Sequence, residues 1–293
     1  MSSASPPFFF VIPLHGEAPY AHLAVESAIS QVGPPVRVVL IRDDNYDDSD
    51  LLSKFPHGSI EYQKAHTWGI AANWNNALDY VTDGYCTILH QDDVLHPQYA
   101  SVITTLFREH PDAAAFAGAW TINTSGRRIF SLADFVKTLL RPRGPIVRLR
   151  GETGLVSIVR GNWIFCPTVC YNLTKPFPWR FRAEYEMVLD LDMYLQILLH
   201  GGAIVGTHRP LYYYRRHSGS TTSQLTQSLG RFQEEVVYYQ KMSRLLNEQG
   251  YGRAASVCRR RVILRLHIIS VALTAIIAGD LRRFFNLFVL ATT

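Results

Sequence analysis

Short apolar runs typical of strands alternate with helical periodicity through the first 120 residues, and this alternation constrains the fold more than any other feature. Runs rich in β-branched or aromatic side chains lie at residues 8–12, 36–41, 59–63, 85–89 and 113–120. Helical patterns lie between them, at residues 20–31, 69–81 and 97–109. Strands that alternate with helices form a largely parallel sheet covered by those helices. The sequence therefore predicts an α/β protein with a mixed, mostly parallel sheet flanked by helices.

The pattern is less regular after residue 120 and becomes wholly helical from about residue 225. We expect a hairpin around Ser125 and Gly126, helices at residues 131–140 and 188–200, strands at 203–207 and 211–214, and long helices at 232–249 and 252–278. A chain of 293 residues is long enough for one large domain with an appendage. We therefore predict a main domain at residues 1–225, divided into parts at about 8–120 and 121–225, and a helical extension at 226–293.

Charge is segregated along the chain. Residues 1–126 carry 5 basic and 14 acidic side chains, whereas residues 127–160 carry 8 and 2, and residues 226–293 carry 10 and 4. An acidic first half is suited to a bound cation, and two basic segments are suited to phosphates or an anionic surface. Solvated surface charge would also explain each block taken alone.

The four cysteines have no zinc or redox spacing. Buried free thiols in a reducing compartment, and hence a cytoplasmic location, are the expected state. The first residues lack the basic region and apolar core of a signal peptide. The longest mainly apolar stretch, residues 268–278, has eleven residues, whereas a membrane-spanning helix needs about 20. The sequence therefore predicts no spanning helix.

Polar clusters follow three of the expected strands where each strand ends. They are His15 to Glu17, the pair Asp43 and Asp44, and the pair Asp92 and Asp93. Ligands of open α/β sheets bind beyond the carboxyl ends of the strands. Adjacent carboxylates repel each other unless a cation or hydrogen-bond donors offset their charge, and Mg²⁺ or Mn²⁺ accepts carboxylate and phosphate oxygens together. We therefore predict a divalent-cation and phosphate site at Asp92 and Asp93.

The sequence contains no P-loop and no Gly-x-Gly-x-x-Gly pattern, so kinases, P-loop NTPases and dinucleotide dehydrogenases lose their usual support. Six other segments resemble, in order, motifs of the family 2 inverting glycosyltransferases. They are FFFVIPLHGEAPY (8–20), RVVLIRDDNYDDS (37–49), GIAANWN (69–75), YCTILHQDDVLHP (85–97), VLDLDMYLQIL (188–198) and YYYRRHSGSTT (212–222). The resemblance implies a GT-A-like, Rossmann-type fold. The chain departs from the family at Asn45, Trp74, His90 and Leu189, where Gly, Arg, Asp and Glu are common.

The resemblance also implies a nucleotide site. Asp43 or Asp44 would accept the N3–H of a uracil or thymine base. The other residues on this side would be Pro13, Leu14, His15, Glu17, Gly69, Asn75 and Asp92.

A Mn²⁺ or Mg²⁺ ion is implied beside this site. Asp92 would contact the ribose or the metal, and Asp93 the metal. His90 removes one carboxylate, so the donor diphosphate and water would supply most other ligands. His217 lies in a Ser-, Thr- and Gly-rich segment that would close over the diphosphate, with His217 as a metal or phosphate partner; an ordinary surface loop is the alternative.

Asp190 matches the catalytic aspartate of the family. A single-displacement, inverting transfer needs one general base to take the proton of the acceptor hydroxyl. The alternative for Asp190 is a carboxylate that stabilises a helix N-terminus. Asp192 is expected to be structural.

The acceptor or diphosphate side would include Asn162, Trp163, Arg215 and Arg216. Trp163 would stack on a sugar ring, and a place in the core is equally compatible with its sequence.

Arginines bracket the apolar stretch near the end of the chain, at positions 259–261, 265, 282 and 283. Such a pattern is typical of a helix lying on an anionic membrane, here residues 258–293 at the inner face. Packing on the main domain, or on a second copy in a homodimer, is the alternative. Nucleic acid is not expected, because aromatic residues do not interleave with the basic ones.

The sequence thus predicts metal-assisted, inverting transfer of a sugar from a UDP- or dTDP-sugar to a hydroxyl of a glycan or lipid-linked glycan, as in cell-envelope polysaccharide biosynthesis. A sugar-phosphate nucleotidyltransferase would need a Gly-rich activating loop, and the segment at 13–20 has one Gly. A catalytically degenerate protein that binds nucleotide sugars is the remaining alternative.

Overall fold

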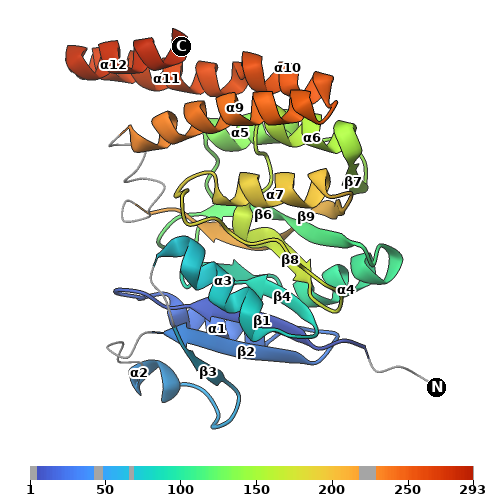
Figure 1. Cartoon of the computed structure of the whole chain (residues 1–293). Helices are drawn as coiled ribbons and strands as arrows, with labels where there is room; N and C mark the ends of the chain where they lie inside the picture. Colours follow the sequence, from blue (N-terminus) through green and yellow to red (C-terminus); the bar gives the residue numbers. More distant parts are fainter. Residues whose placement is uncertain (1–4, 43–48, 66–68, 218–228, 293) are drawn as a thin grey trace.

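The computed structural model describes residues 5–42, 49–65, 69–217 and 229–292, which fold around one mixed sheet (Figure 1). In this part of the chain the sheet has nine strands in the order β3-β2-β1-β4-β8-β6-β9-β5, and β7 pairs with β9. The strands are β1 (Phe8–Pro13), β2 (Val36–Arg42), β3 (Glu61–Lys64), β4 (Tyr85–Ile88), β5 (Val94–Leu95), β6 (Ala113–Ile122), β7 (Ile146–Arg150), β8 (Val169–Asn172) and β9 (Ala203–Arg215). The predicted mixed α/β sheet is confirmed.

Parallel pairing is concentrated in the N-terminal half of the sheet. β1 runs parallel to β2 and β4, and β2 runs parallel to β3. β8 enters between β4 and β6 in the antiparallel direction, and β6 and β9 are again parallel. The carboxyl ends of β1, β2 and β4 therefore lie together at one edge, where the predicted polar clusters begin.

Helices cover both faces of the sheet. They are α1 (Ala21–Ile29), α2 (Ser49–Leu52), α3 (Ile70–Tyr80), α4 (Tyr99–Glu109), α5 (Leu132–Leu140), α6 (Gly151–Arg160), α7 (Leu189–Leu199), α9 (Gly230–Glu248), α10 (Gly252–Arg260), α11 (Val262–Ile277) and α12 (Leu281–Thr292), with a 3₁₀ turn at Cys166–Thr168. β1 shows why two layers form. Phe8, Phe10 and Ile12 pack with α1 and α4, while Phe9 and Val11 pack on the other face with α3 and α7, because successive strand side chains point to opposite faces.

Several elements differ from the sequence prediction. The strands expected at 203–207 and 211–214 are one strand, β9, with an irregular register opposite Gly118. Its middle contains Arg209 and Pro210, which interrupt the apolar pattern. The helix expected at 252–278 divides into α10 and α11 at Arg261, whose φ of 34° lies in the left-handed region. β7, α6 and β8 occupy residues 146–172, where the sequence pattern was weak.

The C-terminal helices pack on the rest of the molecule at the end opposite β3 (Figure 1). Phe232 and Leu246 of α9 belong to the same buried cluster as residues of α3 and α7. The Glu234 carboxylate accepts the backbone N–H groups of Glu186, Met187 and Val188 at 2.7–3.1 Å, just before α7. α9 is thus docked on the main sheet domain. The predicted boundary at residue 225 lies outside the described residues and stays a prediction.

Candidate active site

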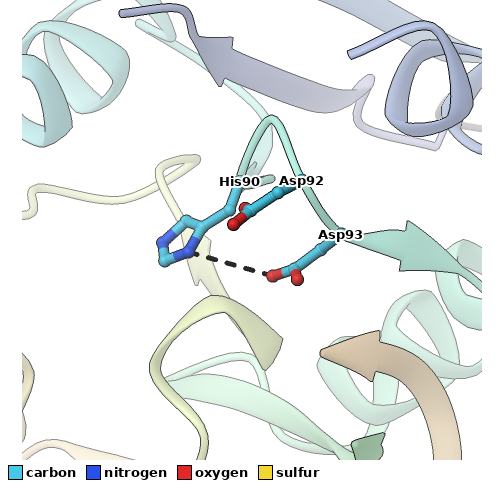
Figure 2. A group of neighbouring side chains, drawn as sticks. All are labelled: His90, Asp92 and Asp93. Carbon is cyan, nitrogen blue, oxygen red and sulfur yellow. Dashed lines mark ion pairs between the residues drawn. The ribbon is translucent and has the colours of Figure 1, made fainter. Parts of the chain in front are cut away.

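The loop after β4 carries the clustered acidic residues. Leu89 continues the pairing with β1, since its N–H donates to the carbonyl of Val11 at 2.9 Å. The chain then turns sharply, with the Asp93 N–H donating to the carbonyl of His90 at 3.2 Å. This turn directs the side chains of His90, Asp92 and Asp93 toward one another (Figure 2).

Asp93 is fully buried and held by β9. Its Oδ1 accepts the Arg215 backbone N–H at 2.7 Å, and its Oδ2 accepts the Tyr212 hydroxyl at 2.9 Å. Burial, and next the charge of Asp92, raise the pKa of Asp93 well above its usual range, while both hydrogen bonds oppose the rise. A cation at this point would offset the cost of ionising a carboxyl group without solvent contact.

Asp92 points into the same cluster but keeps some exposure. Its Oδ2 lies 2.8 Å from Nε2 of His217, and its backbone carbonyl accepts Nε of Arg215 at 2.7 Å. His217 therefore lies at the acidic loop, as the sequence indicated. The segment that follows it, 218–224, is outside the described residues.

His90 stacks on Trp74, with ring centroids 5.5 Å apart and an interplanar angle of 23°. These are two of the positions where the chain departs from the family motifs, and α3 and the β4 loop bring them into contact. A stacked aromatic pair thus occupies the positions at which an Arg and an Asp are common. Burial lowers the pKa of His90, which favours its neutral, ligand-competent form.

The donor set fits a divalent ion. Ligand atoms of His90, Asp92 and Asp93 all lie within 4.8 Å of one another. Nδ1 of His90 is 3.8 Å from Oδ2 of Asp93, too far for a hydrogen bond but compatible with two ligands that each reach about 2.1 Å to a shared ion. The buried Nε2 of His90 has no hydrogen-bond partner in the described chain. From the sequence, His90 is expected to remove one carboxylate ligand from the site. The structure makes it a candidate nitrogen ligand. Because histidine is a common metal ligand, its residue type alone could have indicated this role.

The loop after β1 lies against the acidic loop. Pro13 and Leu14 are buried, and the Leu14 N–H donates to the carbonyl of Ile41 at 2.8 Å. His15 is exposed and exchanges two hydrogen bonds with the Gln91 side chain, at 2.9 and 3.0 Å. Glu17 is exposed nearby in sequence. The predicted β1 loop is thus tied to the acidic loop by Gln91, a residue that the sequence interpretation did not single out.

The other predicted nucleotide residues have different outcomes. Gly69 precedes α3 with a φ of 103°, a conformation that favours glycine. Asn75 exchanges hydrogen bonds of 2.8 and 2.9 Å with the backbone of Phe181. Because both polar atoms of its side chain hold this loop, the structure favours an anchoring role for Asn75 over the predicted nucleotide contact. Asp43 and Asp44 lie outside the described residues.

Asp190 opens α7 on the other side of the site. Its Oδ2 accepts Nδ2 of Asn162 at 2.8 Å, and its Oδ1 accepts the N–H of Leu191 at 2.7 Å. Burial raises the pKa of Asp190, and the charge of Lys137 is the main opposing influence. Burial lowers the pKa of Lys137 to about 8, while Asp190 opposes that change. Lys137, which the sequence interpretation missed, is thus electrostatically coupled to the predicted base.

Asp192 has the structural role expected of it. It is buried and accepts the Tyr238 hydroxyl of α9 at 3.1 Å and Nε2 of Gln196 at 2.7 Å.

Trp163 is a core residue, which is the alternative that the sequence left open beside a stacking role. It is 4% exposed, packs against Phe116 and His208, and donates Nε1–H to the Ser157 hydroxyl at 3.2 Å. Its neighbour Asn162 points to Asp190 instead.

Arg215, the last residue of β9, is buried, and Arg216 follows it with partial exposure. The Arg215 guanidinium donates to the backbone carbonyls of Asp92, Asn123 and Thr124 and lies 4.3 Å from the Tyr20 ring centroid. Arg216 forms a bidentate contact with Asp134 at 2.7 and 3.1 Å. Both arginines therefore position neighbouring segments, and the acceptor or diphosphate role expected of them stays a prediction.

The sequence profile described as glycosyl transferase family 2 matches residues 9–172, more than half of the 293-residue chain. An uncharacterized protein of Mycobacterium tuberculosis is 23% identical over 75% of this chain and 70% of its own length. An uncharacterized glycosyltransferase of Rickettsia typhi is 19% identical over 78% of this chain and 70% of its own length. Among solved structures, S. aureus TarS 1–349 in complex with UDP-GlcNAc matches with a TM-score of 0.58 and 14% identity, over 96% of this chain and 90% of that one. TarS 1–349 in complex with UDP matches with a TM-score of 0.56 over the same shares.

Proposed function

The chain belongs to glycosyl transferase family 2 and is a glycosyltransferase with a GT-A-like fold, and we propose that it transfers a sugar with inversion from a nucleoside diphosphate donor to an acceptor hydroxyl. The observation that carries this proposal is a pair of carboxylates in separate environments, the buried Asp93 in a His–Asp–Asp cluster and the half-buried Asp190 with Asn162 and Lys137. The complexes of TarS with UDP-GlcNAc and UDP support a uridine donor over a thymidine one.

The donor side would bind the diphosphate through a Mn²⁺ or Mg²⁺ ion. His90, Asp92 and Asp93 would hold the ion, which supplies Lewis-acid stabilisation of the departing diphosphate. Tyr212 and the Arg215 N–H fix the Asp93 carboxylate, and His217 fixes that of Asp92. The chain's contribution is to orient these ligands before the donor arrives.

Asp190 would act as the general base. The acceptor oxygen forms a bond to the anomeric carbon, the bond from that carbon to the diphosphate oxygen breaks, and the acceptor proton moves to the Asp190 carboxylate. Asn162 and the Leu191 N–H stabilise that carboxylate in its ionised form, which can accept the proton. One base is sufficient because the transfer has a single displacement.

A panel of nucleotide sugars tests the proposal directly. The purified chain is incubated with each donor, Mn²⁺ and a candidate glycan, and the released nucleoside diphosphate is measured. Metal-dependent release with one donor supports transfer, and the anomeric configuration of the product, compared with that of the donor, identifies inversion. A chain that binds the donor but releases no nucleoside diphosphate with any acceptor would be the catalytically degenerate sugar-binding protein. The Trp74–His90 stack supports testing this alternative, because both residues depart from the family motifs.

We further propose that the C-terminal helices lie on an anionic membrane surface. Among the described residues, no helix has the length and apolar character needed to cross a bilayer. Large apolar side chains nevertheless remain exposed on α11 and α12, namely Val262, Leu266, Ile269, Leu273, Ile276, Ile277, Leu281, Phe285, Phe288 and Val289. The neighbouring Arg259, Arg260 and Arg282 are exposed as well. A homodimer through the same surface is the alternative, and the cytoplasmic location stays a prediction.

A further inference from the structure

α5 carries an exposed apolar face that the proposed chemistry does not use. Leu132, Phe135 and Leu139 are 68%, 48% and 68% exposed, and their spacing places them on one side of the helix. The residues that lead into α5, Ile129 and Phe130, are also exposed, at 37% and 63%. Burying large apolar side chains is favourable, so such a stripe on a short helix indicates a contact surface.

The exposed charges around α5 are all positive. Arg127 and Arg128 precede the helix, and Arg141 and Arg143 follow it, all four exposed. The acidic residue of this segment, Asp134, is buried, forms the capping box with Ser131, and is paired with Arg216. Arg128 also lies 4.4 Å from the ring centroid of Trp120, a partly exposed tryptophan of β6. The exposed surface of residues 127–143, which we call the α5 surface, therefore has an apolar centre with cationic ends.

The opposite side of α5 reaches the acceptor side of the site. Nζ of Lys137 donates to the carbonyl of Ile164 at 3.1 Å and lies 4.3 Å from the Phe165 ring centroid. Lys137 is also the charged group that most opposes the rise in the pKa of Asp190. The α5 surface and the side chain that influences the proposed base therefore lie on opposite sides of the same helix.

The α5 surface also adjoins the C-terminal helices. A methyl group added to Gly161 would come within 2.7 Å of Cδ1 of Leu140 and 3.3 Å of Cγ2 of Ile263. The end of α5 and the start of α11 therefore approach the same glycine. This is where the exposed apolar side chains of α11 begin, at Val262 and Leu266.

We propose that the α5 surface docks on an anionic phospholipid bilayer and lies beside the acceptor side of the site. Arginines attract the headgroups, and the apolar stripe enters the region between headgroups and acyl chains. A soluble polyanion would use the arginines but leave Leu132, Phe135 and Leu139 in water. A symmetric contact with a second copy would bring the arginines of both chains close together. Residues 127–143 have no exposed acidic side chain to offset the repulsion between these like charges.

Docking at the α5 surface also bears on the class of acceptor, provided that the proposed function is correct. With the bilayer beside α5, an acceptor anchored in the membrane by a lipid reaches Asp190 from the membrane side. This geometry therefore favours a lipid-linked acceptor over a soluble glycan.

Vesicle co-sedimentation of the full chain tests the docking without requiring activity. Vesicles of phosphatidylcholine are compared with vesicles that also contain phosphatidylglycerol. We expect binding to the anionic vesicles, with a loss of at least about tenfold in the triple variant Leu132→Ser, Phe135→Ser, Leu139→Ser. The matched control is Val237→Ser, a 63% exposed valine on α9, which should bind like the parent chain.

Other outcomes would overturn the proposal. Parental binding by the triple variant, with its fold intact by circular dichroism, would leave no role for α5. Equal binding to neutral vesicles would remove the anionic requirement. Binding to soluble polyphosphate that exceeds binding to vesicles and is unaffected by the triple variant would identify a polyanion site, and a dimer disrupted by Phe135→Ser in sedimentation velocity would identify a second copy. A chain that docks on vesicles but transfers no sugar would contradict the proposed function and not the docking.

Discussion

The two sides of the site each centre on a carboxylate, the buried Asp93 and the half-buried Asp190, but they are built in different ways. Asp93 lies at the end of the sheet and is held by Tyr212 and a backbone N–H of β9. Asp190 lies at the start of α7 and is held by Asn162 from a separate loop, with Lys137 of α5 as its main electrostatic partner. The proposed donor side is assembled from strand ends, whereas the proposed acceptor side is assembled from helices and loops.

This difference suits two separate roles, binding of the donor on one side and of the acceptor on the other. Strand ends are fixed by the register of the sheet, so they suit a nucleotide diphosphate and metal that are common to many donors. Loops and helix ends vary without disturbing the sheet, so they suit an acceptor that differs among enzymes. The Oδ1 atom of Asn162 is buried and has no hydrogen-bond partner among the described residues.

The largest expected effect is on Asp190. Asp190→Asn should lower kcat by about 10²–10⁴-fold, because the variant cannot accept a proton, while the donor Kd measured by calorimetry stays unchanged. Asp192→Asn is the matched control on the same helix and should reduce stability while largely retaining kcat, since Asp192 contacts Tyr238 and Gln196. Near parental turnover by Asp190→Asn would remove the base role from this residue.

The donor side is tested by removing the Tyr212 hydroxyl, which donates to the Asp93 carboxylate. Tyr212→Phe removes the hydrogen bond to Oδ2 of Asp93 and should weaken Mn²⁺ binding by about 10–100-fold, measured by electron paramagnetic resonance with and without UDP. Tyr213→Phe, one residue along the same strand, should bind Mn²⁺ like the parent chain. Equal Mn²⁺ affinity in both variants would mean that Asp93 does not ligate the ion.

The anchoring role of Asn75 predicts an effect on stability alone. Asn75→Ala leaves the backbone of Phe181 without two hydrogen bonds and should lower the free energy of unfolding in urea by roughly 1–3 kcal/mol. The donor Kd should not change. Asn76→Ala is a control, because its buried Nδ2 has no partner in the described chain. A weaker donor Kd at unchanged stability would restore the nucleotide contact to Asn75.

The smallest expected effect is a shift of the pH profile. Asp190 must be ionised to accept a proton, and burial raises its pKa, so kcat/KM should fall as the pH drops through that raised pKa. The Asn162 hydrogen bond lowers the pKa of Asp190, so Asn162→Ala should raise it further and move the acidic limb to higher pH. Ser157→Ala, which loses only the bond to Trp163, should leave the limb in place. A limb that stays fixed or moves to lower pH in Asn162→Ala would contradict the coupling.

The order of the α/β elements and the positions of the main carboxylates follow from local sequence patterns. Asp92 and Asp93 were predictable because they follow an apolar strand directly, and the chemistry at a strand end depends on neighbours in sequence. Asp190 was predictable from the resemblance of its helix to a family motif. These signals are local, so one sequence was enough to detect them.

Contacts between groups from distant parts of the chain depend on the tertiary fold. The Trp74–His90 stack, the Tyr212 support of Asp93 and the coupling of Lys137 to Asp190 join residues that are 16, 119 and 53 positions apart. The same holds for three residues expected on the acceptor or diphosphate side. Trp163, Arg215 and Arg216 each satisfy their polar atoms inside the protein. No periodicity records such contacts, because the direction of a side chain at the end of a strand or helix is fixed by the packing of segments that meet only when the chain has folded.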